Sequence, residues 1–156
     1  MTNMTSIKAH LLALGFAALS TAPALAGGHG EAEKIAEVLR SYETFVNESN
    51  AEGLGSLYTD DAVLMPDRFD IFEGADAITG FYAFAFSALT LDLVFEIDTD
   101  DIVVDGDTAY ATTTSTGTRF IKDADLTVPE INRELWVFEQ VGGDWKIARY
   151  AFNKSE

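Results

Sequence analysis

The spacing of apolar residues changes near residue 90, and this change limits the folds that are open to the chain. Before it, apolar residues recur at steps of three and four, which is typical of amphipathic helices. After it, much of the chain alternates between apolar and polar residues, which is typical of strands. The first half therefore predicts helices over 31–49, 51–58 and 75–86, with short strands at 62–65 and 71–72 before the third helix.

The second half predicts four long strands. They cover residues 90–104, 108–121, 131–141 and 145–153. Asp105-Gly106 and Gly142-Gly143 are signals for tight hairpins, and residues 122–129 predict a polar connection between the second and third strands. Helices followed by an antiparallel meander indicate an α+β domain. In such a domain the three N-terminal helices pack on one face of a curved, mostly antiparallel sheet.

Residues 1–26 have the features of a cleavable secretory signal peptide. Lys8 precedes a short apolar stretch, and the segment ends in Ala24-Leu25-Ala26, a small-residue pattern typical of signal cleavage. The apolar stretch is short for a membrane-spanning helix. We therefore expect cleavage after Ala26, a flexible lead over 27–31, one domain over 32–153, and a periplasmic or secreted protein. The alternative is a buried N-terminal helix or an uncleaved anchor.

The composition limits the partners and the catalytic groups that the chain can use. The formal net charge of −16 disfavours nucleic acid and anionic membranes as partners. The chain has no cysteine, and its two histidines, His10 and His29, precede the predicted domain. Acid–base chemistry would therefore depend on Asp, Glu, Tyr, Lys or Arg. The acidic residues between 98 and 107 are interpreted as a solvated edge rather than a calcium site, and we expect no metal or other cofactor.

Four stretches carry a resemblance to a known superfamily. They are Tyr42-Glu43-Thr44-Phe45-Val46-Asn47, Leu57-Tyr58-Thr59-Asp60-Asp61-Ala62-Val63, Phe72-Glu73-Gly74-Ala75-Asp76-Ala77-Ile78 and Gly143-Asp144-Trp145-Lys146-Ile147-Ala148. In this order and spacing the chain resembles the NTF2-like superfamily, and its SnoaL-like and ketosteroid-isomerase-like branches (DUF4440-type domains) are the nearest. The resemblance implies a cone-shaped fold with a pocket that opens toward one end. Members of the superfamily include enzymes, ligand-binding proteins and assembly modules, so the fold does not name the activity.

The resemblance to the isomerases also implies two catalytic candidates. These enzymes carry a tyrosine on the first helix, which Tyr42 matches. Their base follows an Asp-Asp-Ala turn, where an ungapped match puts Pro66, with Asp67 one position later. Tyr42 would donate a hydrogen bond and Asp67 would act as base. The alternatives are a core aromatic at residue 42 and an exposed loop carboxylate at residue 67.

Pairing about Gly142-Gly143 predicts the register of the last hairpin. It puts Trp136 opposite Arg149 and Phe138 opposite Ile147, so that Glu134 and Arg149 share a face as an ion pair or a ligand clamp. Both faces of this hairpin are substantially apolar, whereas a sheet with one solvated face alternates more cleanly. A second copy of the chain would cover the outer face, and we therefore expect a homodimer through the sheet.

Three functions remain open at this point. The favoured one is binding of a small, mostly apolar molecule without catalysis, because aromatic residues are frequent and convergent titratable groups are few. The candidate ligand-binding residues are Tyr42, Tyr58, Met65, Phe81, Glu134, Trp136 and Arg149. The alternatives are an acid–base enzyme that uses Asp67 and Tyr42 for isomerisation, cyclisation or hydration, and a dimeric accessory module without a ligand.

Overall fold

A computed structural model describes residues 26–155 of the chain, so the predicted signal peptide, apart from Ala26, lies outside the described residues. The helices are α1 (Ala26–Asn47), α2 (Ala51–Ser56) and α3 (Ala75–Ala88), and the strands are β1 (Tyr58–Met65), β2 (Phe72–Glu73), β3 (Leu89–Glu96), β4 (Ile102–Asp105), β5 (Thr108–Ile121), β6 (Leu126–Val141) and β7 (Asp144–Lys154). Short 3-10 turns at Thr99–Asp101 and Lys122–Ala124 complete the described elements.

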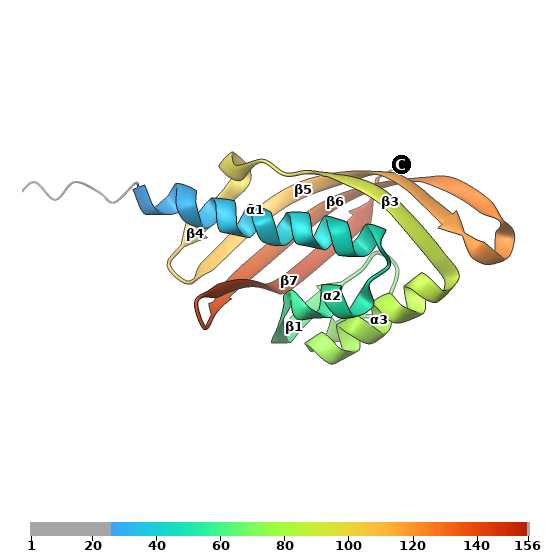
Figure 1. Cartoon of the computed structure of the whole chain (residues 1–156), viewed down its shortest axis with the longest axis horizontal. Coiled ribbons are helices and arrows are strands. Elements are labelled where there is room, and N and C mark those ends of the chain that lie inside the picture. Colours follow the sequence, from blue (N-terminus) through green and yellow to red (C-terminus); the bar gives the residue numbers. More distant parts are fainter. Residues whose placement is uncertain (1–25, 156) are drawn as a thin grey trace, which may run out of the picture.

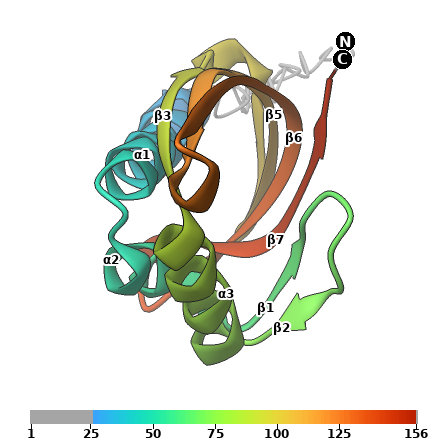
Figure 2. The ribbon, with the colours of Figure 1, turned by 90° about the vertical axis from the view of Figure 1, so that its right-hand side faces the viewer.

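The predicted α+β architecture is confirmed. The described strands form one sheet in the order β2-β1-β7-β6-β5-β3, and β4 pairs with β5 beyond the end of β3. All pairings are antiparallel except that of β1 with β7. Figure 1 shows α1 lying along the sheet, and Figure 2 shows the long strands curving around one side with α1 and α3 on the other. None of the helices within residues 26–155 is long and apolar enough to span a membrane.

Two segments that were expected to be loops belong to regular elements. The flexible lead predicted over 27–31 is helical, as the first turns of α1. Glu31 Oε2 accepts hydrogen bonds from Trp145 Nε1 (2.7 Å) and Gln140 Nε2 (3.1 Å), and these bonds hold α1 against the β6–β7 hairpin. Strand β6 begins at Leu126, inside the predicted connection, and it accommodates Pro129 because there it pairs with β5 alone.

The predicted pairing of Trp136 with Arg149 is wrong, because β7 contains a bulge. The register shifts between Phe138, which pairs with Ile147, and Val137, which pairs with Arg149, so Ala148 is an extra residue. Trp136 therefore pairs with Tyr150. The bulge turns Tyr150 toward the helices and leaves Arg149 on the opposite face of the sheet.

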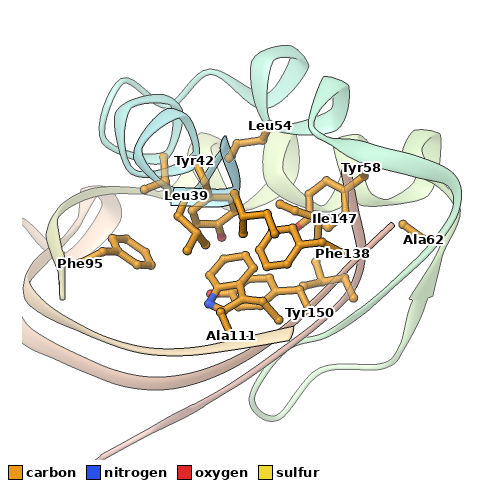
Figure 3. Close-up of a cluster of buried hydrophobic side chains, with 14 of the residues drawn as sticks. Leu39, Tyr42, Leu54, Tyr58, Ala62, Phe95, Ala111, Phe138, Ile147 and Tyr150 are labelled. Atoms are coloured by element: carbon orange, nitrogen blue, oxygen red, sulfur yellow. The ribbon is translucent and has the colours of Figure 1, made fainter. Parts of the chain in front are cut away.

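Aromatic side chains fill the space between α1 and the sheet (Figure 3). Tyr42 is buried and makes edge-to-face contacts with Phe95, Trp136 and Tyr150, at centroid distances of 5.6, 4.9 and 5.5 Å. The rings of Trp136 and Tyr150 stack at 3.6 Å with an interplanar angle of 6°. Burying each such ring contributes roughly 2–3 kcal/mol to the free energy of unfolding. This cluster therefore fixes α1 on the sheet.

Strands β3 and β5 approach each other closely at Gly117, which pairs with Leu93. A Cβ atom on Gly117 would lie 1.9 Å from the backbone oxygen of Asp92. Backbone atoms cannot move aside as a flexible side chain can, so the curvature of the sheet at this point requires glycine.

We predict that Gly117→Ala lowers the free energy of unfolding by about 3 kcal/mol, because the added methyl group forces the two strands apart. Gly80→Ala is the matched control, since a Cβ atom on Gly80 in α3 meets nothing within 4 Å. Alanine favours the helical conformation more than glycine does, so the control should raise the free energy of unfolding by roughly 0.5–1 kcal/mol. Urea unfolding followed by circular dichroism measures both, and equal effects of the two substitutions would contradict the role given to Gly117.

Candidate functional site

A cavity of about 240 Å³ lies between the helices and the curved sheet. Aromatic and aliphatic side chains of α3 and β3, such as Phe81, Phe86, Leu91 and Leu93, form most of its wall. Its charged and amide lining residues are Asp67, Arg119, Glu130, Asn132, Glu134 and Lys154. The cavity is therefore a largely apolar chamber with one polar wall.

The polar wall follows from alternation along β6. Glu130, Asn132 and Glu134 occupy every second position and are buried, because successive side chains of a strand point to opposite faces. On the neighbouring β5, Ser115 pairs with Asn132 and Thr113 pairs with Glu134. A row of buried polar side chains thus runs across two strands on the face that meets the helices.

The carboxylate of Glu134 is buried and hydrogen-bonded. It accepts from the hydroxyl of Thr113 and, through Oε1, from Ser115 Oγ at 2.7 Å. Burial raises the pKa of Glu134, because desolvation penalises the charged form, and the two hydrogen bonds partly oppose that rise.

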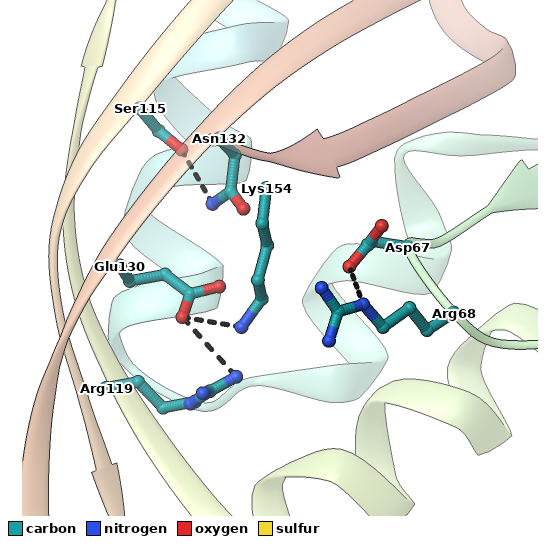
Figure 4. A network of polar contacts seen from close by, with 7 residues as sticks. All are labelled: Asp67, Arg68, Ser115, Arg119, Glu130, Asn132 and Lys154. Atoms are coloured by element: carbon teal, nitrogen blue, oxygen red, sulfur yellow. Dashed lines mark hydrogen bonds and ion pairs between the residues drawn. The ribbon is translucent and has the colours of Figure 1, made fainter. Parts of the chain in front are cut away.

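An ion cluster lies at the other end of the polar row (Figure 4). Oε2 of the buried Glu130 lies 2.9 Å from Lys154 Nζ and 3.4 Å from Arg119 Nη1. Asn132 pairs with Lys154 across β6 and β7, and its Nδ2 donates to Ser115 Oγ at 3.2 Å. Two cations therefore share one carboxylate in the wall of the cavity.

Three tyrosine hydroxyls form a chain beside the cavity. The hydroxyl oxygen of Tyr82 lies 2.8 Å from that of Tyr42 and 3.1 Å from that of Tyr58. Burial raises the pKa of Tyr82 to about 12 and that of Tyr42 and Tyr58 well above the usual range, so all three stay protonated at neutral pH. Three hydroxyl hydrogens serve two mutual hydrogen bonds, which leaves one hydrogen for another acceptor.

Four of the candidate residues named from the sequence line the cavity. They are Tyr42, Asp67, Phe81 and Glu134. Asp67 lies on the loop after β1, its side chain is 21% exposed, and its Oδ2 is 3.3 Å from Arg68 Nε. Tyr42 and Asp67, the proposed donor and base, therefore face the same chamber.

The other four candidates lie elsewhere. Tyr58 is buried behind Tyr82, and Trp136 is buried where its Nε1 donates to Thr113 Oγ1 at 2.8 Å. Met65 ends β1 with its side chain 39% exposed. Arg149 lies outside the cavity because of the bulge in β7, and its Nη1 donates to the backbone oxygen of Asp61 at 3.4 Å. The predicted clamp of Glu134 with Arg149 is therefore wrong.

Sequence reasoning did not identify Arg119, Glu130, Asn132 and Lys154 as site residues. A signal for two of them was present, since Glu130 and Asn132 continue the alternation of Glu134, Trp136 and Phe138. Glu130 falls outside the strand predicted over 131–141, whereas Asn132 lies inside it, and its position on the inward face follows from the same alternation. Lys154 lies one residue beyond the predicted end of the last strand.

Comparison with known families identifies the domain. The family model of the SnoaL-like domain matches residues 31–151. The chain belongs to the SnoaL-like family. A search of curated proteins found no match to this SnoaL-like chain.

Solved structures share the fold of this SnoaL-like domain. A ketosteroid isomerase-like protein from Erwinia carotovora atroseptica SCRI1043 is 26% identical with a TM-score of 0.76, over 81% of this chain and 97% of that chain. A candidate scytalone dehydratase from Novosphingobium aromaticivorans DSM 12444 is 14% identical with a TM-score of 0.70, over 81% and 85% of the two chains. An NTF2-like protein with a cystatin-like fold from Novosphingobium aromaticivorans is 21% identical with a TM-score of 0.61, over 77% of this chain and 79% of that chain. These likenesses bear out the NTF2-like, ketosteroid-isomerase-like architecture.

We predict that Glu134→Gln stabilises the protein more at pH 7 than at pH 4. A carboxyl group whose pKa is raised on folding favours the folded state while it is protonated, and this contribution is lost as the pH rises through its folded-state pKa. Glutamine does not ionise, so the free energy of unfolding of the variant does not decrease in this way as the pH rises. Urea unfolding of both proteins across this pH range measures the difference, and a pH-independent difference would contradict the assignment.

Proposed function

We propose that this SnoaL-like protein binds a small, mostly apolar molecule in its cavity. The observation that carries the proposal is the composition of the cavity wall, in which aromatic and aliphatic side chains surround one row of polar groups. Small-molecule sites typically combine an apolar lining with a few polar anchors. The protonated hydroxyls of Tyr42 and Tyr82, which line the cavity, would supply a hydrogen bond to a ligand oxygen.

Fluorescence titration with N-phenyl-1-naphthylamine, a neutral apolar probe, tests this proposal. We expect saturable binding that Leu91→Asn weakens about tenfold, because the substitution puts an amide into the apolar wall. Val141→Asn is the control, since Val141 is exposed at the end of β6 and outside the cavity. The absence of saturable binding, or equal effects of the two variants, would count against the cavity as the site. If the probe binds as expected, native mass spectrometry of the protein purified from its own cells would identify the bound species.

Acid–base catalysis is the second candidate function. It is favoured by the fact that Asp67 and Tyr42 line the same cavity, and by the description of one relative as ketosteroid isomerase-like. In this mechanism the carboxylate of Asp67 takes a proton from the carbon beside a carbonyl group. The hydroxyl of Tyr42 stabilises the charge that develops on the carbonyl oxygen.

Hydrogen–deuterium exchange beside the carbonyl of 2-tetralone tests this candidate. If the protein catalyses exchange, Asp67→Asn and Tyr42→Phe should each slow it about 100-fold. Asp70→Asn, in the same loop but exposed and outside the cavity, should leave the rate unchanged. Nuclear magnetic resonance measures the exchange, and a wild-type rate no faster than in buffer would favour binding alone.

A homodimer through the sheet remains part of the proposal. The face of the sheet away from the helices exposes apolar side chains on four strands. They are Val94, Val103, Tyr110, Ile131 and Leu135, each at least two-fifths exposed. A second copy would remove this surface from water, and light scattering at micromolar concentration would detect the dimer. If the protein is an accessory dimer without a ligand, light scattering would show the dimer and the fluorescence titration would show no saturable binding of the probe.

Export also remains a proposal, and it is supported by the sequence of residues 1–26. The mature chain would then begin at Gly27, which mass spectrometry of the protein from the periplasm or culture medium would reveal.

A further inference from the structure

The charges in the polar wall of the cavity do not cancel locally. Lys154 and Arg119 both pair with Glu130, so this cluster of three residues carries one excess positive charge. All three side chains line the cavity, and Glu130 is buried. Such an excess is unexpected in a chain with 26 acidic and 10 basic residues. A partly buried cation without its own counterion favours an anion nearby.

Two buried polar atoms in the same wall lack hydrogen bonds. Within residues 26–155, nothing accepts from Arg119 Nε and nothing donates to Asn132 Oδ1. Asn132 is only 5% exposed and lines the cavity. Buried groups of this kind are costly when left unpaired, so each is a candidate contact for a bound molecule.

The neighbouring hydrogen bonds fix which atom of Asn132 is available. The hydroxyl of Ser115 donates its single hydrogen to Glu134, so it can only accept from Asn132, through Nδ2. The amide oxygen of Asn132 is therefore the atom left for a donor. Arg119 Nε–H, in contrast, requires an acceptor.

The other acidic groups around the cavity have partners of their own. The carboxylate of Glu134 is held by Thr113 and Ser115, and that of Asp67 faces Arg68. Neither is within ion-pair distance of Arg119 or Lys154 in the described structure. The excess positive charge therefore stays at the end of the cavity where β5, β6 and β7 come together.

We propose that the ligand of this cavity is an amphipathic carboxylate, whose anionic group binds at Arg119 and Lys154 while its apolar body lies against α3 and β3. This inference rests on the proposed binding function and adds the chemical class of the ligand. The carboxylate supplies the acceptor that Arg119 Nε lacks, and it offsets the positive charge left by the shared Glu130. A hydroxyl group beside the carboxylate would satisfy Asn132 Oδ1.

Displacement of N-phenyl-1-naphthylamine by two matched compounds tests the inference. The compounds are 1-naphthaleneacetate and 2-(1-naphthyl)ethanol, which share a ring system and differ in the anionic group. We expect the acid to bind about tenfold more tightly than the alcohol at neutral pH, because hydrogen bonds between ions of opposite charge are the stronger ones. Arg119→Gln and Lys154→Gln should each reduce this preference severalfold, because the affinity for the acid falls more than the affinity for the alcohol.

Arg133→Gln is the matched control. It removes the same charge from β6, but Arg133 is exposed on the far face of the sheet and does not line the cavity. The preference for the acid should survive in this variant. Circular dichroism checks folding, and Lys154, near the end of β7, provides a second variant if Arg119→Gln does not fold.

The outcomes separate the inference from the proposed function. Equal binding of acid and alcohol, a preference for the alcohol, or displacement by neither compound would overturn the carboxylate while probe binding still supported the cavity. A preference for the acid that persists equally in Arg119→Gln and Lys154→Gln would also overturn it. Failure of the probe itself to bind would remove both the proposed function and the inference.

Discussion

One extra residue in β7, Ala148, determines which side chains face the helices. Because side chains alternate along a strand, the bulge reverses the parity of every later residue. Tyr150, Phe152 and Lys154 therefore point inward, and Arg149 points outward. The stack on Trp136, the contact with Tyr42 and the cation beside Glu130 all depend on this reversal. The hydrophobic core and the polar wall of the cavity thus both depend on the bulge at Ala148.

The core and the cavity share side chains. Tyr42 packs edge-on against four aromatic rings, and its hydroxyl joins the chain that leads to Tyr82 and the cavity. The polar row differs from this aromatic layer in kind, because its buried groups satisfy one another across β5 and β6 except at Arg119 and Asn132. The apolar part of the wall therefore contributes to stability, whereas the incompletely paired part is available for recognition.

The architecture could be predicted from the sequence because, in long segments, the period of the apolar residues indicates both the type of element and its buried face. The strand over 108–121 matches β5 residue for residue, and the polar run at its centre contains Thr113 and Ser115 of the polar wall. The site was harder to predict. A bulge leaves no clear signal in a period-two pattern, so Arg149 was assigned to the wrong face. Pro129 also concealed the start of β6, since a proline tolerated beside one neighbouring strand looks like a loop residue.

Strand β7 connects the two parts of the sheet. Strand β7 is the last to be synthesised, yet it lies inside the sheet, between β1 and β6. Among the described strands β1 has no other long neighbour, because β2 contributes only two residues. Strands β1 and β2 therefore join the rest of the sheet only through β7. Loss of β7 would divide the sheet into two parts, so the parallel pairing of β1 with β7 is the seam that closes the domain.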